Sequence, residues 1–326
     1  MEPGKGISVI VCCYNSAARL PETILHLALQ QVPAEIPWEV IIINNSSTDD
    51  TPAIAKIEWD KYQLPQVGFK IVDEEKPGLS NAREKGINTS VFNYIVFCDD
   101  DNLLNKNYLN IAFNILAQND NIAAVGGQST AISDVTIPAW FESSKNNYAV
   151  GQQAKNSGDV TCRKYLWGSG ITIRKERYIK AFLNFPSILT GRKGDELSSG
   201  EDSEMCMRFI LMGYQLYYSD ELIFKHYIAA ERLTDSYNKK LVEGFITAYH
   251  KLNIYSRLID IINMGTNEKY GMLLKSALRV LIGSTIPLNR WNMENEKLNV
   301  YLLSGYKPAA VGKDIVSIRN LTKNKS

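Results

Sequence analysis

The first hundred residues alternate short apolar runs with helix-like segments, and this alternation leaves few folds open to the chain. Four runs are typical of buried strands: Ile7–Cys13, Trp38–Ile43, Phe69–Val72 and Tyr94–Cys98. Helical patterns lie between them, beginning near Ala18, near Thr51 and after Pro77. Strands that alternate with helices are typical of a parallel sheet covered on both faces. The sequence therefore predicts an α/β fold with a mostly parallel sheet flanked by helices.

Polar side chains follow three of these strands at the point where each strand ends. They are Tyr14 and Asn15, then the run from Asn44 to Asp49, then Asp99, Asp100 and Asp101. In open α/β sheets, ligands bind in the crevice outside the carboxyl ends of the strands. We therefore expect the three loops to line one crevice, which is the position of a nucleotide-type site.

The three adjacent carboxylates at Asp99–Asp101 repel one another, so this strand end requires a cation or a ring of hydrogen-bond donors nearby. Hard divalent cations prefer oxygen ligands, and Mg²⁺ usually takes one or two carboxylates together with substrate phosphates. The alternative is an acidic turn that caps a helix beginning at Asn105, because Asp and Asn are good N-caps. The triplet alone does not decide between the two interpretations.

The composition argues against several classes of protein. A formal net charge of +1 over 326 residues gives no support for binding nucleic acid through a strongly basic surface. The five cysteines include no Cys-x-x-Cys pair, which argues against a disulfide framework and fits a reducing cytosol. No apolar targeting segment precedes the strand at Ile7, so a cytoplasmic protein is expected.

The pattern changes after Ile122. Further strands are predicted at Ala123–Gly127, Trp167–Arg174, Gln215–Tyr218 and Leu222–Phe224. The segment Leu189–Gly200, rich in glycine and charge, is expected to be mobile, and a helix is expected to begin at Glu201. Helices are also predicted at Tyr237–Asn253, Tyr255–Met264 and Lys269–Gly283. The chain thus divides into an α/β domain, residues 1–232, and a helical C-terminal extension, residues 233–326.

Six short motifs, taken in order, resemble those of the family 2 glycosyltransferases. They are Ser8–Asn15, Ile43–Asp49, the segment Gly78-x-x-x-Ala82-Arg83, Asp99–Asp101, Gly200–Asp202 and the later His226. The resemblance covers roughly residues 7 to 230. It implies the GT-A fold, with a Rossmann-like nucleotide half and an acceptor half. It also implies a metal-dependent, inverting enzyme that moves a sugar from a nucleotide diphosphate, with a UDP-sugar the expected donor, to an acceptor hydroxyl.

By this resemblance, strand ends and one helix bind the nucleotide-sugar. The residues are Tyr14, Asn15, Asn44, Asn45, Arg83, Asp99 and Asp100. Tyr14 matches the position where an aromatic face stacks on the base, and its alternative is a partly buried strand-end tyrosine. Asn44 and Asn45 stand where the family usually has aspartates, and an amide both donates and accepts, so the identity of the base is in doubt. Arg83 either steadies the nucleotide site or pairs with the acidic triplet.

The resemblance also assigns a metal site and a base. Asp101, Asp99 and His226 are expected to hold Mn²⁺ or Mg²⁺, which would offset charge on the departing nucleotide. For His226, a purely structural role is the alternative. Asp202, with Glu201 as its neighbour, matches the carboxylate that takes the proton of the attacking hydroxyl. For this pair, the alternative is an acidic first helical turn favoured by the helix dipole.

On the acceptor side, the resemblance points to Trp167, Gly168 and Ser169, where Trp167 either stacks on a sugar or packs in the core. The expected acceptor is a glycan or a lipid-linked sugar in cell-surface polysaccharide or glycoconjugate synthesis. The apolar face of the helix Lys269–Gly283 fits packing on the domain or peripheral contact with an anionic membrane. A non-catalytic nucleotide-sugar-binding protein of the same fold is a second hypothesis, motivated by the amides at Asn44 and Asn45.

Overall fold

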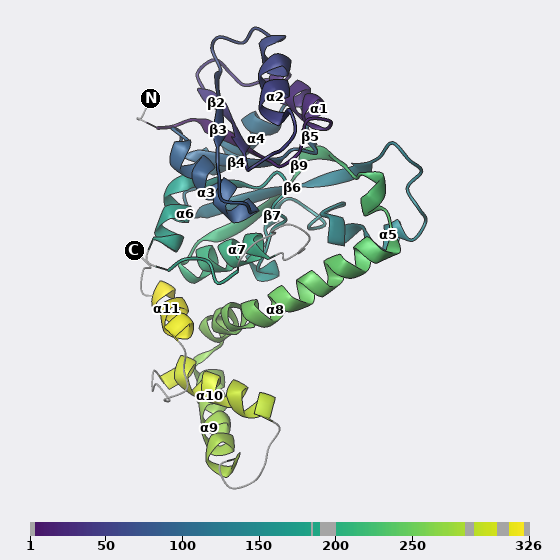
Figure 1. Ribbon diagram of the computed structural model, residues 1–326. Coiled ribbons are helices and arrows are strands. Elements are labelled where there is room, and N and C mark those ends of the chain that lie inside the picture. The colour runs from purple at the N-terminus through teal and green to yellow at the C-terminus, as the bar shows by residue number, and fades with distance from the viewer. Residues whose placement is uncertain (1–3, 184, 190–199, 284–289, 305–312, 323–326) are drawn as a thin grey trace.

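The computed structural model of the chain describes residues 4–183, 185–189, 200–283, 290–304 and 313–322 (Figure 1). Most of the segment expected to be mobile, Leu189–Gly200, lies outside these residues. The strands are β1 Ile7–Cys13, β2 Trp38–Asn44, β3 Gly68–Asp73, β4 Tyr94–Asp99, β5 Asn102–Leu104, β6 Ile122–Ile132, β7 Gly158–Asp159, β8 Thr172–Arg174 and β9 Gln215–Tyr227. The helices are α1 Leu20–Ala28, α2 Thr51–Asp60, α3 Leu79–Thr89, α4 Tyr108–Gln118, α5 Phe141–Ser144, α6 Lys175–Phe182, α7 Glu201–Leu211, α8 Asp235–Asn263, α9 Thr266–Gly283, α10 Arg290–Ser304 and α11 Lys313–Leu321.

Within the described ranges the strands form one sheet of nine, in the order β3-β2-β1-β4-β8-β6-β9-β5, with β7 paired to β9. The strands β3, β2, β1 and β4 are parallel, as expected. In this register Cys13 lies beside Asn44, and Cys12 lies beside Asp99. The loops that follow β1, β2 and β4 therefore meet at one edge of the sheet.

Apolar residues that alternate along each parallel strand bury both faces of the sheet. In β1, Val9 and Val11 pack into the core with α1, α2 and α4, whereas Ile10 packs into the core with α3, α6 and α7. Figure 1 shows these two helical layers above and below the strands. A sheet covered on both faces has few polar positions except at its strand ends, so polar function is concentrated there.

The second half of the sheet is mixed. β8 is antiparallel to β4 and β6, β6 is parallel to β9, and β5 is antiparallel to β9. The β5–β9 pairing places Asn102 opposite His226, which brings this histidine next to the acidic triplet. The expected α/β fold is confirmed, with the parallel order confined to the first four strands and to the β6–β9 pair.

Two predicted features near the triplet are wrong. The helix expected at Asn105 begins at Tyr108, and the strand β5 separates it from the triplet, so Asp99–Asp101 do not cap it. The strand expected at Trp167–Arg174 is reduced to β8, because Gly170 adopts a left-handed φ of +72° and ends the extended run. The residues before Gly170 are thereby free to turn toward the strand ends.

Two other predictions divided elements that are continuous. The strands expected at Gln215–Tyr218 and Leu222–Phe224 are both part of β9, which continues through a register shift opposite Gly126 and Gln128. The helices expected on either side of Ile254 form the single helix α8, because Leu252 and Tyr255 are buried in one cluster with residues of α7.

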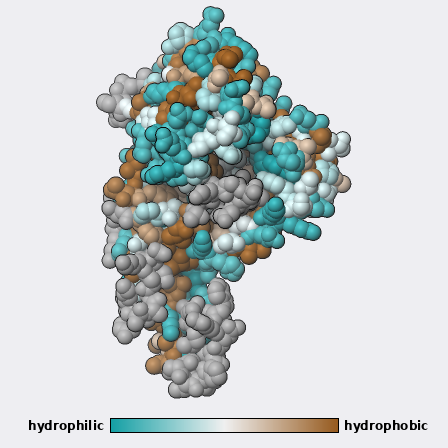
Figure 2. Space-filling model, in the orientation of Figure 1, coloured by the Kyte–Doolittle hydropathy of each residue, from teal (hydrophilic) through white to brown (hydrophobic). Residues whose placement is uncertain are grey.

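The C-terminal helices extend away from the sheet. Figure 1 shows α8 running beneath the sheet and α9 and α10 projecting from its far end. Along α9, the exposed apolar side chains are Tyr270, Leu274, Leu278 and Leu281. Figure 2 shows that apolar side chains gather over this lower part of the molecule on the face in view. In the part of the chain that the structure describes, no helix combines the length and apolarity needed to cross a bilayer. Membrane contact, a cytoplasmic location and the domain boundary at residue 232 stay predictions.

Candidate active site

A cavity of about 1290 Å³ opens at the carboxyl ends of the parallel strands. Most residues singled out from the sequence line it: Tyr14, Asn45, Arg83, Asp99, Asp100, Asp101, Trp167, Gly168, Ser169, Glu201, Asp202 and His226. Asn15 and Asn44 are not among its lining residues. The structure thus brings the acidic triplet and Asp202 into one cavity, although they are about a hundred residues apart in the chain. The chemical roles of these residues stay predictions.

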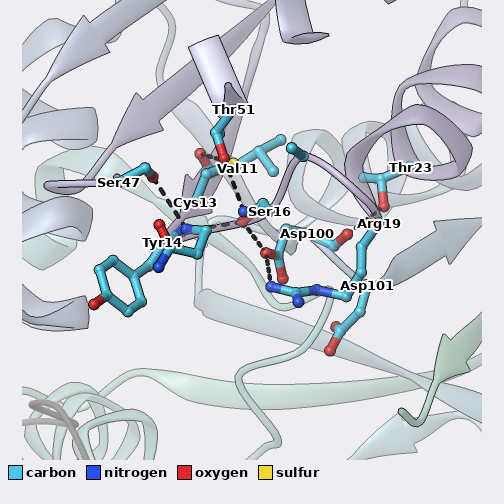
Figure 3. A network of polar contacts seen from close by, with 12 residues as sticks. Val11, Cys13, Tyr14, Ser16, Arg19, Thr23, Ser47, Thr51, Asp100 and Asp101 are labelled. Carbon is cyan, nitrogen blue, oxygen red and sulfur yellow. Dashed lines mark hydrogen bonds and ion pairs between the residues drawn. The ribbon is translucent and has the colours of Figure 1, made fainter. Parts of the chain in front are cut away.

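Asp100 is held by the loop that follows β1. Its Oδ2 accepts hydrogen bonds from Ser16 Oγ and from an Arg19 guanidinium nitrogen at 2.7 Å (Figure 3). Its backbone oxygen accepts from Thr23 Oγ1 at 2.8 Å. Burial and the neighbouring charge of Asp101 outweigh these contacts and raise the pKa of Asp100 to about 6. Asp100 is therefore a structural anchor between β4 and the start of α1.

Asp101 is flanked by a histidine at the end of β9 and by an arginine in the turn after it. His226 Nε2 lies 3.3 Å from Asp101 Oδ1, and an Arg232 guanidinium nitrogen lies 3.0 Å from Oδ2. Burial would raise the pKa of Asp101, but the charges of His226 and Arg232 outweigh it and hold the pKa below its ordinary value. Asp101 is therefore the one carboxyl group of the triplet whose pKa lies below its ordinary value.

Asp99 faces the acceptor-side loop. Ser169 Oγ donates to Asp99 Oδ2 at 2.8 Å. Burial and the charge of Asp101 raise the pKa of Asp99, partly opposed by Arg83 and by the hydrogen bond from Ser169. Ser169 thus has a direct contact with the triplet, which the sequence did not predict.

Arg83 forms an ion pair with Asp202 rather than with the triplet. The pair is the contact of an Arg83 guanidinium nitrogen with Asp202 Oδ1, and the guanidinium also lies over the ring of Phe97 at 4.9 Å. Burial would lower the pKa of Arg83, but the charges of Asp202 and Asp99 outweigh it and raise the pKa. The arginine therefore orients Asp202 from the side of α3.

Gly168 and Asp202 touch across the cavity. A Cβ atom added at Gly168 would lie only 2.1 Å from Asp202 Oδ2 and 2.4 Å from Oδ1. A side chain of any size here would displace the carboxylate, so the glycine is required by the close approach of this loop to the first turn of α7.

The two amides after β2 have local structural contacts. Asn44 Nδ2 donates to Asp73 Oδ1 at 2.8 Å, away from the cavity. Asn45 donates to the backbone oxygens of Glu74 and Lys76, and its Oδ1 accepts from Gly78 N at 2.8 Å. These contacts fix the loop between β3 and α3. They explain why amide side chains occupy positions 44 and 45 without reference to a bound base.

The aromatic candidates are accessible from the cavity. Tyr14 is 58% exposed, so it is not a buried strand-end tyrosine, and Figure 3 shows its ring pointing away from the Asp100 contacts. Asn15 is turned toward the neighbouring loop, where its Oδ1 accepts from Thr48 N at 2.8 Å. Trp167 is only partly buried, and the Arg163 guanidinium lies 5.5 Å from its ring centroid.

Sequence reasoning missed the two arginines that neutralise the triplet, Arg19 and Arg232. The carboxylates require nearby cations, and each arginine lies a few residues beyond a predicted site position, Tyr14 and His226 respectively. The requirement for cations near the triplet, together with these sequence positions, could have indicated both arginines.

The residues around Asp101 fit a divalent cation in part. No group of three or more His, Cys, Asp or Glu converges on a metal position among the described residues. Asp101 Oδ1 and His226 Nε2 are 3.3 Å apart, close to the separation of about 3 Å between adjacent ligands of an ion with bonds of about 2.1 Å. His226 Nε2 faces Asp101, whereas its Nδ1 is buried with no hydrogen-bond partner among the described residues. Two protein ligands suit Mg²⁺ or Mn²⁺ only if phosphate or water oxygens complete the shell.

An open α/β sheet with an acidic cavity at its strand ends fits a GT-A enzyme, and the family match assigns it to the glycosyl-transferring class. Residues 8–175, just over half of the sequence, match the model of Glycosyl transferase family 2, and the chain belongs to that family. A solved structure of S. aureus TarS 1–349 in complex with UDP-GlcNAc superimposes with a TM-score of 0.56. That comparison covers 98% of this chain and 90% of TarS 1–349 at 17% identity, and it supports the fold.

Relatives are similar over different lengths. EpsH of Bacillus subtilis is 25% identical over 74% of this chain and 67% of its own length. The cholesterol galactosyltransferase of Borreliella burgdorferi is 30% identical over 37% of this chain and 32% of its own length. The poly(ribitol-phosphate) β-N-acetylglucosaminyltransferase TarP of Staphylococcus aureus is 29% identical over 47% of this chain and 45% of its own length. The chain thus spans about two thirds of the first relative and less than half of the other two.

Proposed function

We propose that the chain is a metal-dependent, inverting glycosyltransferase that uses a UDP-sugar and a hydroxyl acceptor on a glycan or lipid-linked sugar. The observation that carries this proposal is the shared cavity of Asp101 and Asp202, since the reaction needs an ion-holding end and a base at one reacting centre. Similarity to TarS, solved with UDP-GlcNAc, supports the donor class. Similarity to TarP and to a poly-β-1,6-N-acetyl-D-glucosamine synthase supports a glycan acceptor and a role in polysaccharide synthesis.

The donor end is the part of the cavity between β1 and β4. Tyr14 offers an exposed aromatic face for the base, and Arg19, Arg83 and Arg232 surround the region with positive charge. A diphosphate carries charge that guanidinium groups bind well, through charge-assisted hydrogen bonds. Arg19 and Arg232 are paired with Asp100 and Asp101, so they also position the triplet.

Asp101 and His226 would hold the divalent cation, with Asp99 close by. When bound, Mg²⁺ or Mn²⁺ would act as a Lewis acid that offsets the charge on the departing nucleotide. Arg232 already contacts the same carboxylate of Asp101, so this chain supplies part of that positive charge itself.

Asp202 is the proposed base. The acceptor hydroxyl gives its proton to the Asp202 carboxylate while its oxygen forms the new bond to the anomeric carbon. The bond from that carbon to the diphosphate oxygen breaks, and the nucleoside diphosphate leaves with the electron pair. Arg83 and Gly168 constrain the Asp202 carboxylate from two sides, which fixes its geometry for proton transfer.

The non-catalytic alternative gains no support from the amides that motivated it. Asn44 and Asn45 hold the loops after β2 and β3, and Asp202 is positioned by its own ion pair. A protein that only binds a nucleotide-sugar has no need of a constrained carboxylate beside the acceptor loop.

The experiment compares wild type with Asp202→Asn in a UDP-sugar panel with Mn²⁺. We expect hydrolysis or transfer to fall by about 10²- to 10⁴-fold in the variant, because the loss of a positioned base costs that much. Thermal stabilisation by the same nucleotide-sugar should persist. A chelator should stop turnover of the wild type, and Mn²⁺ or Mg²⁺ should restore it. Asp60→Asn, an exposed position on α2, is the matched control. Full activity of Asp202→Asn would remove Asp202 from the base role.

A further inference from the structure

One face of α8 forms a wall of the catalytic cavity. The α8 residues that line the cavity are Tyr237, Phe245, Ile246, Ala248, Tyr249, Leu252, Asn253 and Ser256. From Phe245 onward their spacing of three and four residues places them on one side of the helix. At 1.5 Å per residue, the continuous part of this wall, from Phe245 to Ser256, is about 16 Å long. This helix begins well beyond residue 175, where the family match ends.

Apart from Asn253 and Ser256 the wall is made of aliphatic and aromatic residues, and it is open to the cavity. Ile246 is 53% exposed and Tyr249 is 65% exposed, although both are large apolar side chains. None of the α8 residues that line the cavity in the described structure is charged. Apolar side chains exposed in a concave site, as opposed to scattered over a convex surface, mark a binding surface for an apolar group.

The wall adjoins the proposed base. A Cβ atom added at Gly200 would lie 2.9 Å from Ala248 Cβ and 3.3 Å from Leu252 Cδ1, so the residue before Glu201 packs directly on α8. Gly200 also has a φ of +113°, a conformation that other residues rarely adopt. The first turn of α7, which carries Asp202, therefore begins against the apolar wall.

The acceptor-side loop is tied to the same helix. Lys164 Nζ donates to Ser256 Oγ at 2.8 Å and forms an ion pair with Asp260 at 2.5 Å. This contact places Tyr165 and Trp167, both in the cavity lining, on the same loop that reaches α8. The α8 wall and the loop thus belong to one part of the cavity.

The cavity has room for more than a donor. Pockets for a single small ligand measure about 300–1,000 Å³, and this cavity measures about 1290 Å³. Its two ends also differ in chemistry. The end at β1 and β4 carries carboxylates and arginines suited to a diphosphate, whereas the α8 end carries aliphatic and aromatic side chains.

We propose that the α8 wall is the acceptor subsite and that it takes an acceptor whose hydroxyl-bearing sugar is joined to an apolar group. This inference rests on the proposed function, because only a glycosyltransferase has an acceptor. The preference for apolar groups is a property of the wall itself. Ile246 and Tyr249 determine the preference, because they present the most exposed apolar surface of the α8 wall.

Binding of two simple glycosides tests the proposal without turnover. The probes are n-octyl β-D-glucopyranoside below its micelle concentration and methyl β-D-glucopyranoside, with dissociation constants measured by titration calorimetry. We expect the full chain to bind the octyl glycoside at least tenfold more tightly, because each buried methylene strengthens binding severalfold. The double variant Ile246→Ser/Tyr249→Ser should lose that advantage. Val242→Ser, at an exposed apolar position of α8 outside the cavity lining, should keep it.

Equal affinity of the wild type for the two glycosides would overturn the inference, and so would an octyl advantage that survives in the double variant. Thermal stabilisation by UDP-GlcNAc with Mn²⁺ is measured in parallel and should be the same in all three proteins. If UDP-GlcNAc with Mn²⁺ does not stabilise the wild type, the result counts against the proposed function. If the wild type binds the donor but does not prefer the octyl glycoside, the result counts against the α8 subsite alone.

Discussion

The buried pair of Glu204 and Arg208 holds helix α7, which carries Asp202, in place, and its removal gives the sharpest stability prediction. Both side chains are fully buried, with Arg208 and Glu204 Oε1 2.6 Å apart. Arg208 also donates to the backbone oxygens of Ala181, Phe185 and Pro186. Tyr255 of α8 donates to Glu204 at 2.8 Å. The pair therefore joins α7 to the end of α6, to the segment after it and to α8.

Arg208→Met removes the guanidinium while keeping an apolar side chain of similar length. Glu204 would then be a buried charge without its partner, and three backbone oxygens would lose their donor. Breaking a buried pair in this way costs about 3–5 kcal/mol. An unfolding entropy of about 2.1 cal/mol/K per residue corresponds to about 0.7 kcal/mol/K for this chain, so the expected fall in Tm is about 4–7 °C.

The assay is thermal unfolding followed by circular dichroism of Arg208→Met, Glu204→Gln and the double variant Arg208→Met/Glu204→Gln, which with wild type make a complete cycle. The double variant should be more stable than the sum of the single losses predicts, because it leaves no uncompensated charge. Lys56→Met, which breaks an exposed pair with Asp60, should leave Tm within about 1 °C. A Tm of Arg208→Met within 1 °C of wild type would refute the argument that this pair supports α7.

Three further predictions follow from individual contacts. Gly168→Ala places a methyl group against the Asp202 carboxylate, so turnover should fall about 100-fold while donor binding persists. In the control Gly271→Ala the added Cβ would meet nothing within 4 Å, so turnover should be unchanged. Equal activity of the two variants would contradict the close contact between Gly168 and Asp202. Burial raises the pKa of Asp100 from 3.8 to about 6, so the stability contributed by its neutral form is present below pH 4 and lost as the pH rises through 6. In Asp100→Asn, the metal-free Tm should decline less than that of wild type between pH 4 and 6, and parallel pH profiles would exclude this role. Leu274→Glu places a negative charge among the exposed apolar side chains of α9, so it should reduce flotation with anionic liposomes. Negligible flotation of both the wild type and the variant would exclude peripheral membrane contact.

Local sequence patterns determined much of the architecture. Apolar runs that end in polar residues predicted the first four strands within one or two residues, because buried strands need continuous apolar side chains and their ends must satisfy polar backbone groups. The same patterns placed Tyr14, Asn45 and the acidic triplet at the edge where the cavity lies. Local patterns failed where pairing or packing between distant segments overrode them. The single strand β9 and the continuous helix α8 are examples, since β6 and α7 hold them together.

The charge balance of the site was decided only by the tertiary structure. Arg19 reaches Asp100 across 81 positions of the chain, Arg83 reaches Asp202 across 119, and Arg232 reaches Asp101 across 131. The sequence by itself determined that three adjacent carboxylates require positive charge, because their mutual repulsion follows from their spacing alone. Which cations meet that need depends on strand order and helix packing, which bring distant segments within hydrogen-bonding distance. No periodicity along the chain encodes such a meeting, because it arises from the packing of the whole sheet.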